Sequence, residues 1–277
     1  MHVMLSGDEL RPYRQFAELL AEEAGRISLS YFRKPIDVEM KADLTPVTRA
    51  DRETERFIRE SIAHRFPGHL ITGEEFGTTL GVRKPENADK APGSSAAESL
   101  YRWVVDPIDG TKAFVLGVPL YTTLIALLYN EQPVVGIIHN PVLGETVSAS
   151  VGGGCTLNGA ACKVSGCDSL AEARVHTTDY ANLARLEPDL ARVLLGRVGS
   201  ARTWADAYGY LLIASGRADV MIDPAMSPWD IAPLGPIIAE AGGRLTALDG
   251  TETWTGDSAL ATNGILHHQI LDLKHGS

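Results

Sequence analysis

The sequence predicts an α/β protein with α+β character in its first half, and three observations support this fold class. Two amphipathic helical segments open the chain at 8–33 and 45–66, strand-like runs in hairpin order follow to about residue 150, and helical and strand-like segments then alternate. With 277 residues and 44% hydrophobic content, the chain can bury one large core or two joined ones. We therefore expect an N-terminal lobe at 1–150 with a mostly antiparallel sheet, and a C-terminal α/β lobe at 151–277.

The two opening helices are predicted from the spacing of their apolar residues. The apolar stripe of segment 8–33 consists of Phe16, Leu19, Leu20, Ala24 and Ile27. In segment 45–66, Thr48 and Asp51 are spaced as in a capping box at the start of a helix. The apolar stripe of that helix consists of Phe57, Ile58, Ile62 and Phe66. Both helices are expected to pack one face on a sheet.

Strand-like runs fill the rest of the first half. HLIT at 69–72 predicts a short strand, and the stretch 77–99, rich in Gly, Pro, Ser and charge, predicts an excursion over the surface. Further strands are expected at 101–105, 120–130, 133–140 and 145–151. Of these, 120–130 and 133–140 are predicted to form an antiparallel hairpin of largely buried strands.

The second half alternates between strands and helices. Strand-like segments lie at 173–178, 218–223 and 243–248, and helix-like segments at 183–198, 206–216 and 231–243. In the last of these helices, Pro236 lies too far from the start to be accommodated, so it should kink the helix or displace its beginning.

The charge and hydropathy of the chain exclude several kinds of partner. A formal net charge of −10 and a pI near 5.3 oppose non-specific binding to nucleic acid or to an anionic membrane. No run approaches the roughly 20 apolar residues of a membrane span. The start, MHVMLSGDELRPYR, lacks the basic stretch and apolar core of an export signal. We expect a cytoplasmic protein without nucleic-acid or membrane partners, in which cations would bind any anionic substrate.

Cysteine and histidine patterns do not predict a soft-metal site. The three cysteines, Cys155, Cys162 and Cys167, match neither a CxxC metal motif nor a disulfide framework, so we expect free thiols. The eight histidines contain no HExxH motif, and His267 and His268 are interpreted as part of a solvated tail. Any metal must therefore be held by oxygen ligands.

The stretch WVVDPIDGTKAF at 103–114 joins an apolar run to two carboxylates. If the run is a strand, Asp106 lies at its carboxyl end, the edge at which α/β sheets carry their sites. Pro107 stiffens the turn that follows, and Gly110 permits an unusual backbone angle. Thr111 then starts a short helix whose first N–H groups are suited to bind a phosphate.

Two carboxylates beside an anion-binding turn require a cation between them. Mg²⁺ prefers carboxylate, phosphate and water oxygens, and two such ions roughly 3.5–4 Å apart would activate a water and stabilise the leaving oxygen. The motif therefore predicts hydrolysis of a phosphate ester. The alternative is structural: Asp106 and Asp109 can be turn residues, with Asp109 capping the next helix, Glu74 a solvated turn acid and Asp230 a helix cap.

Three motifs, in this order, resemble the signatures of the inositol monophosphatase superfamily. They are GEE at 73–75, DPIDGTKAF at 106–114 and PWDIAPLGPIIAEAGG at 228–243, and TPVTRAD at 45–51 and GRAD at 216–219 extend the resemblance over nearly the whole chain. The resemblance implies a layered αβαβα sandwich and a Mg²⁺-dependent phosphatase with two or three ions per subunit. It also implies a small phosphorylated substrate and a homodimer.

The resemblance further implies which residues hold the metals. Glu74, Asp106 and the carbonyl of Ile108 would bind the first ion. Asp106, Asp109 and Asp230 would bind the second. Asp109 and Asp230 are also expected near the substrate.

Four other residues receive roles through the same resemblance. Thr111 would orient the attacking water together with Glu74. The N–H groups of Gly110 and Thr111 would grip the phosphate. Asp51 would support a third, weaker metal site through water, and Glu75 would lie behind the ligands.

The segment RTWADAYGYLLIASGRADVMIDP at 202–224 resembles the histidinol-phosphatase branch, which implies a place in histidine biosynthesis. Trp204, Asp206 and Asp223 stand where inositol enzymes carry a Gly-Thr-Ala-like segment and a glutamate. Histidinol phosphate presents an ammonium and an imidazole, which Asp206 and Asp223 can pair with while Trp204 offers an aromatic face. The alternative places Trp204 in the core and makes Asp206 a cap of the helix beginning at Ala207.

Other substrates and one other class of protein stay open. Lys112 is typical of both the histidinol-phosphatase and the phosphoadenosine-phosphatase branches and so excludes little. The alternatives are an inositol 1-phosphate or broad sugar-phosphate phosphatase, and a phosphoadenosine phosphate nucleotidase, although the latter would need a basic cluster that the sequence lacks. A non-catalytic metal- or phosphate-binding regulator is disfavoured, because every acid needed for turnover is present.

Overall fold

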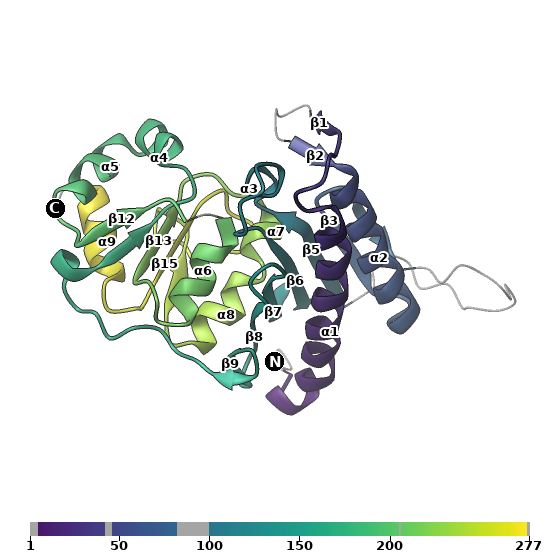
Figure 1. The fold of residues 1–277 in the computed structure, drawn as a ribbon. Coiled ribbons are helices and arrows are strands. Elements are labelled where there is room, and N and C mark those ends of the chain that lie inside the picture. Colours follow the sequence, from purple (N-terminus) through teal and green to yellow (C-terminus); the bar gives the residue numbers. More distant parts are fainter. Residues whose placement is uncertain (1–4, 42–45, 82–99, 205, 276–277) are drawn as a thin grey trace, which may run out of the picture.

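The computed structural model describes residues 5–41, 46–81, 100–204 and 206–275. These residues form layers in the order helices, eight-stranded sheet, helices, five-stranded sheet, helices (Figure 1). The α/β fold class and the αβαβα sandwich implied by the sequence resemblance are thereby confirmed.

The eight-stranded sheet contains every strand predicted in the first half. Its spatial order is β10 (Ala160–Ala161), β9 (Gly154–Leu157), β8 (Glu145–Ser150), β7 (Gln132–Asn140), β6 (Thr122–Tyr129), β5 (Tyr101–Asp109), β3 (Leu70–Gly73) and β4 (Gly77–Leu80). Neighbours are antiparallel except β3 and β5, which are parallel. β4 was not predicted: the stretch 77–99 was expected to be an excursion, but its first residues pair with β3, and 82–99 lie outside the described residues.

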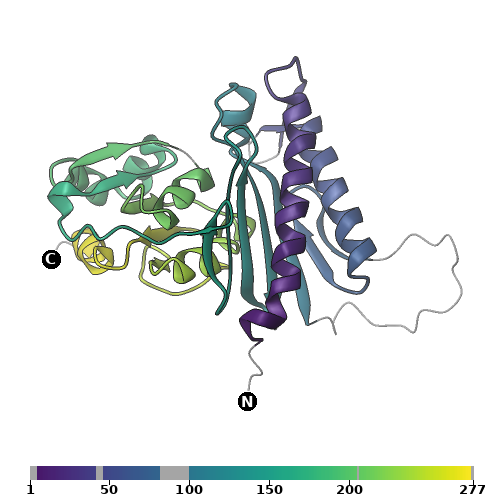
Figure 2. The same cartoon turned by 60° about the horizontal axis from the view of Figure 1, so that its bottom comes forward.

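The outer helices α1 (Gly7–Tyr31) and α2 (Arg49–Arg65) lie side by side on one face of this sheet (Figures 1 and 2). The predicted capping box of Thr48 and Asp51 begins α2. One residue of the predicted α1 stripe was wrong: Leu19 is 65% exposed, because the buried face runs through Ala17 and Ala21 instead. In the sequence between these two helices, β1 (Val38–Met40) and β2 (Pro46–Thr48) form a small antiparallel pair.

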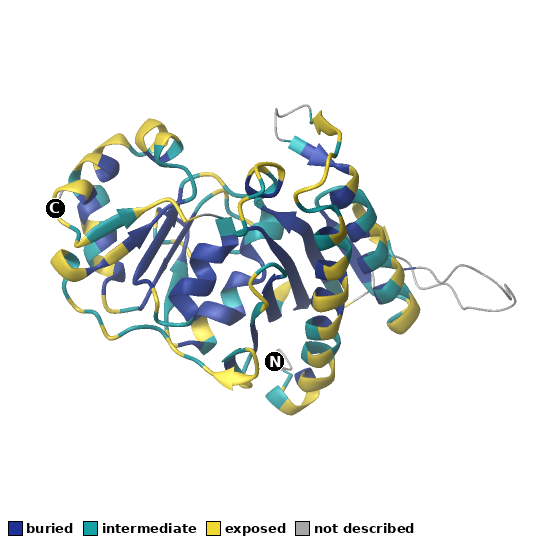
Figure 3. Ribbon diagram, in the orientation of Figure 1, coloured by how far each residue is buried: buried dark blue, intermediate teal, exposed yellow. Residues whose placement is uncertain are grey.

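The middle helices fill the space between the two sheets. They are α6 (Asp206–Ala214), α7 (Pro228–Ile231) and α8 (Leu234–Glu240). α6 and α8 contribute to the largest buried cluster, which also contains Ile138 of β7 and Met221 of the second sheet. Figure 3 shows both helices and the strands beside them as mostly buried. Burial of this cluster joins the two sheets into one core.

The five-stranded sheet is mixed and is covered on its outer face by helices. Its order is β12 (Ser200–Arg202), β11 (Arg174–His176), β13 (Val220–Asp223), β15 (Ala259–Thr262) and β14 (Arg244–Thr246). The outer layer consists of α4 (Tyr180–Leu186), α5 (Pro188–Leu195) and α9 (His267–His275), and the 3₁₀ turn η2 (Leu170–Glu172) precedes β11.

Prolines divide two segments that were each predicted as one helix. The single helix expected at 183–198 is two helices, because Pro188 can only start a new helix and Glu187 lies between them. Pro236 displaces its helix as predicted: α7 ends at Ile231, and α8 begins at Leu234 with Pro236 in its first turn.

The prediction of a solvated tail is wrong for His267, whereas its neighbour His268 is exposed as expected. His267 is fully buried at the start of α9, where its ring nitrogens lie 3.0 Å from Thr246 Oγ1 and 3.1 Å from Thr262 Oγ1. Burial lowers the pKa of His267 to about 4. The histidine therefore joins two strands of the second sheet, a role that long-range contacts create.

The cysteines and the helix lengths agree with the sequence expectations. The three cysteines are free thiols, as predicted, although Cys155 and Cys162 lie 3.5 Å apart through their sulfurs. Among the described residues no helix is both long and apolar enough to cross a membrane. The division into lobes at residue 150 stays a prediction, and the first sheet itself continues to Ala161.

Candidate active site

The strand β5 carries both aspartates of the central motif. It runs on to Asp109, beyond the predicted end at Asp106, but its register against β6 shifts between these two residues because Pro107 has no N–H for the ladder. The Thr123 hydroxyl donates to the Pro107 carbonyl at 2.9 Å, and the Ile108 N–H donates to Asp106 Oδ1 at 3.0 Å. The irregular backbone is thus fixed on both sides.

Three carboxylates converge at this point. Single oxygens of Asp106, Asp109 and Asp230 all lie within 4.8 Å of one another. Asp230 comes from α7, where it also closes a capping box: the Ser227 N–H donates to Asp230 Oδ2 at 2.8 Å. The helix-cap interpretation of Asp230 is therefore correct without excluding the metal interpretation, because the cap fixes the carboxylate beside the other two.

Asp109 connects the cluster to the eight-stranded sheet and to the middle helical layer. Its Oδ2 accepts the Thr122 hydroxyl of β6 at 2.9 Å and the Ala207 N–H of α6 at 2.7 Å. The alternative role as cap of the next helix is wrong: α3 (Thr111–Val115) begins after Gly110 and has no side-chain cap. Asp109 is 9% exposed, so these partners hold it in a nearly dry environment.

Among the residues that the structure describes, no basic side chain forms an ion pair with these three aspartates. Burial raises the pKa of Asp109 to about 7, and burial together with Asp109 raises the pKa of Asp230 to about 8. The pKa of Asp106 lies well above its ordinary value because of burial and the nearby Glu74. A cation between the three carboxylates would remove this electrostatic cost.

The turn after β3 brings two more acids to the site. The Lys41 ammonium donates to Glu74 Oε1 at 2.7 Å and to Glu75 Oε1 at 2.5 Å. Burial lowers the pKa of Lys41, but the two glutamates outweigh burial and raise it above its ordinary value. Burial raises the pKa of Glu75 to about 7. Lys41 was missed by the sequence analysis, because nothing in its local sequence distinguishes it from a surface lysine.

The start of α3 has the turn geometry that the sequence predicted at Gly110. Gly110 has φ 81°, in the left-handed region that favours glycine, and a Cβ there would lie 2.7 Å from Asp206 Oδ2. The Thr111 hydroxyl lies 3.1 Å from the Ile108 carbonyl and 3.4 Å from Asp51 Oδ1. Asp51 is fully buried at the start of α2, and burial raises its pKa. The turn, the main-chain oxygen and the acid of the TPVTRAD segment therefore meet.

The residues expected to recognise the substrate lie where β12 leads into α6. Asp206 adopts φ 51°, and its own N–H donates to Thr178 Oγ1 at 3.0 Å. Burial and then Asp109 raise the pKa of Asp206 well above its ordinary value. Trp204 is 52% exposed and lines a cavity of about 330 Å³, with its ring 5.6 Å from that of His176. Its placement in the core was therefore wrong.

Asp223 ends β13 and is fully engaged by the protein. Its Oδ1 accepts the Thr178 N–H at 2.8 Å and its Oδ2 accepts the Tyr210 hydroxyl at 2.9 Å. Because Thr178 also accepts from the Asp206 N–H, Asp223 anchors the segment that presents Asp206.

Comparison with known proteins identifies the family. A model of the inositol monophosphatase family matches residues 9–275. The chain belongs to this family. A histidinol-phosphatase of Chlorobaculum parvum is 38% identical over 268 residues, which cover 92% of this chain and 95% of that protein. A histidinol-phosphatase of Mycobacterium tuberculosis is 36% identical and covers 96% of this chain and 98% of its own length.

A solved structure supports the same assignment. An IMPase from Thermotoga maritima superposes with a TM-score of 0.81 at 28% identity, covering 95% of this chain and 96% of that chain. The family resemblance expected from the sequence is confirmed. The chain is accordingly a phosphomonoester hydrolase of the inositol monophosphatase family, whose members depend on metal.

The acidic cluster of this family member fits a metal. Its three carboxylates are hard oxygen donors that lie close enough to share one cation, and burial together with neighbouring acids raises their pKa values, a cost that a cation would reduce. Lys41 supplies a cation to Glu74 and Glu75, but no hydrogen bond joins it to these aspartates among the described residues.

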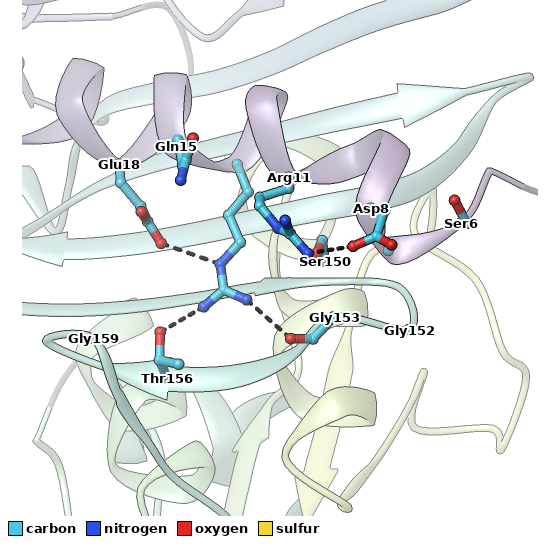
Figure 4. A pocket seen from close by; sticks show the side chains of 12 residues that line it. Ser6, Asp8, Arg11, Gln15, Glu18, Ser150, Gly152, Gly153, Thr156 and Gly159 are labelled. Atoms are coloured by element: carbon cyan, nitrogen blue, oxygen red, sulfur yellow. Dashed lines mark hydrogen bonds and ion pairs between the residues drawn. The ribbon is translucent and has the colours of Figure 1, made fainter.

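A second cavity of about 540 Å³ lies beside the first turns of α1, and none of the cluster residues lines it (Figure 4). Arg14 crosses it and donates to Gly154 O at 2.9 Å and to Ser148 O at 3.0 Å. This guanidinium attaches α1 to β8 and β9. We therefore assign this cavity a structural role.

Proposed function

We propose that this family member is a Mg²⁺-dependent histidinol-phosphate phosphatase, which hydrolyses histidinol phosphate to histidinol and phosphate. The observation that carries the substrate assignment is the position of Asp206, whose carboxylate lies against the Gly110 turn in a buried, acidic environment. Two relatives named histidinol-phosphatase, 38% and 36% identical over nearly the whole chain, support it.

The metal ligands follow the assignment made from the sequence. Glu74, Asp106 and the Ile108 carbonyl would hold one ion, and Asp106, Asp109 and Asp230 would hold a second. Asp51 would support a third through water. When bound, Mg²⁺ polarises the phosphate and lowers the pKa of a water molecule.

The protein's own part in hydrolysis is to position the water and the phosphate. Thr111 lies within hydrogen-bond reach of the Ile108 carbonyl and near Asp51, so its hydroxyl hydrogen has a fixed acceptor. Its lone pairs would then accept a hydrogen bond from the attacking water, which Glu74 would orient from the other side. The N–H groups of Gly110 and Thr111 bind the phosphate oxygens.

The leaving group is recognised by charge and by an aromatic face. Asp206 pairs with the ammonium of histidinol, because a cation beside it relieves the cost of a buried carboxylate. The exposed ring of Trp204 and its cavity receive the imidazole. Asp223 contributes negative potential and anchors Asp206, since its own oxygens are already occupied.

Other substrates fit the position of Asp206 less well. A polyol offers only hydroxyls to Asp206, and a phosphoadenosine phosphate would place a second phosphate in an acidic region. A non-catalytic regulator would need a misplaced Thr111, whereas Thr111 meets its expected neighbours. The homodimer and the cytoplasmic location stay predictions.

The substrate is tested by comparing histidinol phosphate, inositol 1-phosphate and phosphoadenosine phosphate at fixed Mg²⁺. We expect kcat/KM for histidinol phosphate to exceed the others at least about a hundredfold. Asp206→Asn should lower that value roughly tenfold or more and leave inositol phosphate nearly unaffected, because asparagine tolerates the positive φ but loses the charge. Asp189→Asn, at an exposed site on α5, is the control. Comparable rates for all three esters would contradict the assignment.

A further inference from the structure

The turn that carries Glu74 and Glu75 is held by a buried glutamate on α2. Glu55 has no exposed surface. Its Oε2 accepts the Glu75 N–H at 2.7 Å, and its Oε1 accepts the Phe76 N–H at 3.3 Å. Both carboxylate oxygens of Glu55 are therefore directed at the backbone of the turn.

A neighbouring arginine completes this arrangement. Arg59, one helical turn further along α2, donates from Nε to Glu55 Oε1 at 2.7 Å. The same guanidinium reaches Thr79 Oγ1 at 2.8 Å and the Gly77 carbonyl, both in β4. The pair thus attaches α2 to the turn and to the strand that follows it.

The backbone of the turn is shaped to admit this carboxylate. A Cβ at Gly73 would lie 2.2 Å from Glu55 Oε1, so no larger residue fits there while Glu55 keeps its position. On its other side, the Glu74 N–H donates to the Val105 carbonyl at 3.3 Å, one residue before Asp106. Glu74 is therefore located by β5 on one side and by Glu55 on the other.

Glu55 also links this turn to a second acid of the site. Asp51 precedes Glu55 by four residues on α2, and residues at this spacing share a helix face. Both side chains are fully buried. One rigid helix consequently fixes Asp51 directly and the Glu74–Glu75 turn through Glu55.

We propose that Glu55 is a positioning residue, which holds Glu74 at the distance from Asp106 and Asp51 that metal binding requires. This inference rests on the proposed function, because it takes Glu74 as a metal ligand. Glu55 does not touch the metal or the substrate. A carboxylate suits the role because Glu55 must accept three hydrogen bonds and donate none, whereas an amide would turn an N–H toward at least one of the three donors.

The test is Mg²⁺ binding measured by titration calorimetry without substrate. Glu55→Ala is expected to raise the Mg²⁺ dissociation constant at least tenfold, and Glu55→Gln by a smaller factor because one oxygen can still accept the Glu75 N–H. At saturating Mg²⁺, kcat should recover to within about threefold of the wild type. A merely structural role would lower Tm without changing the metal requirement.

The control is Glu53→Gln, which disrupts the matching pair with Arg49 on the same helix. It should leave Mg²⁺ binding unchanged. Should Glu55→Ala fail to fold, Glu55→Gln decides the matter. Mg²⁺ affinity within twofold of the wild type in the folded Glu55 variant overturns the inference and leaves the proposed function intact. A wild type that binds no Mg²⁺ overturns both.

Discussion

Asp106→Asn is expected to lower kcat at least about a thousandfold, a loss of roughly 4 kcal/mol of transition-state stabilisation, while the fold persists. The physical reason is that Asp106 is the ligand proposed to be shared by both metals, so one substitution weakens both sites. Its Oδ1 acceptor for the Ile108 N–H can be supplied by the asparagine amide oxygen, which keeps the turn in place. Phosphate release and circular dichroism measure the two effects.

The same variant is also expected to keep or gain thermal stability without metal, whereas a generally damaging substitution would lose it. In metal-free buffer its Tm should equal or exceed that of the wild type, because burial and Glu74 disfavour the charged form of Asp106 and raise its pKa. Asp272→Asn, at an exposed position of α9, should change neither activity nor Tm. Substantial activity in Asp106→Asn would contradict the role of Asp106 in the metal site.

Metal-free protein is expected to lose stability as the pH rises from about 6.5 to 8.5. The folded-state pKa values of Asp109, Asp230 and Glu75 are raised to about 7, 8 and 7, whereas these groups titrate near 4 when unfolded. In this window the folded state holds protons that the unfolded state has released, so each step up in pH costs stability. We expect Tm to fall by roughly 5 °C or more.

Protonation of the histidines with lowered pKa values does not change the stability between pH 6.5 and 8.5. Burial lowers the pKa of His69, His139 and His267 to about 4, so their effect on stability is confined to pH below the ordinary value of about 6.5. Saturating Mg²⁺ should flatten the curve, because the metal keeps the carboxylates deprotonated in the folded state. A Tm that stays level or rises between pH 6.5 and 8.5 in EDTA would contradict the uncompensated charge of the cluster.

Much of the fold was predictable because local signals agreed with the final structure. The capping box of Thr48 and Asp51, the hairpin of β6 and β7, and the turn at Gly110 each follow from residues adjacent in sequence. The acidic cluster was predictable from motifs, although Asp230 lies more than 100 residues from Asp106. Family resemblance, rather than periodicity, brought these motifs together.

What could not be predicted depends on contacts between distant segments. Glu55 resembles any helical glutamate paired with an arginine four residues later, and only the turn packed against it reveals its position. Lys41 similarly meets two glutamates more than 30 residues away. His267 was assigned to solvent because its burial depends on contacts with Thr246 and Thr262 of two strands, β14 and β15, which its own local sequence does not reveal.

The metal centre is tested most directly by histidinol phosphate hydrolysis in metal-stripped protein before and after addition of Mg²⁺. We expect no phosphate release in EDTA, and full recovery of kcat when Mg²⁺ is restored. Hydrolysis that persists without metal, or that Mg²⁺ fails to restore in folded protein, would contradict the assignment of Asp106, Asp109 and Asp230 as the metal centre of this phosphatase.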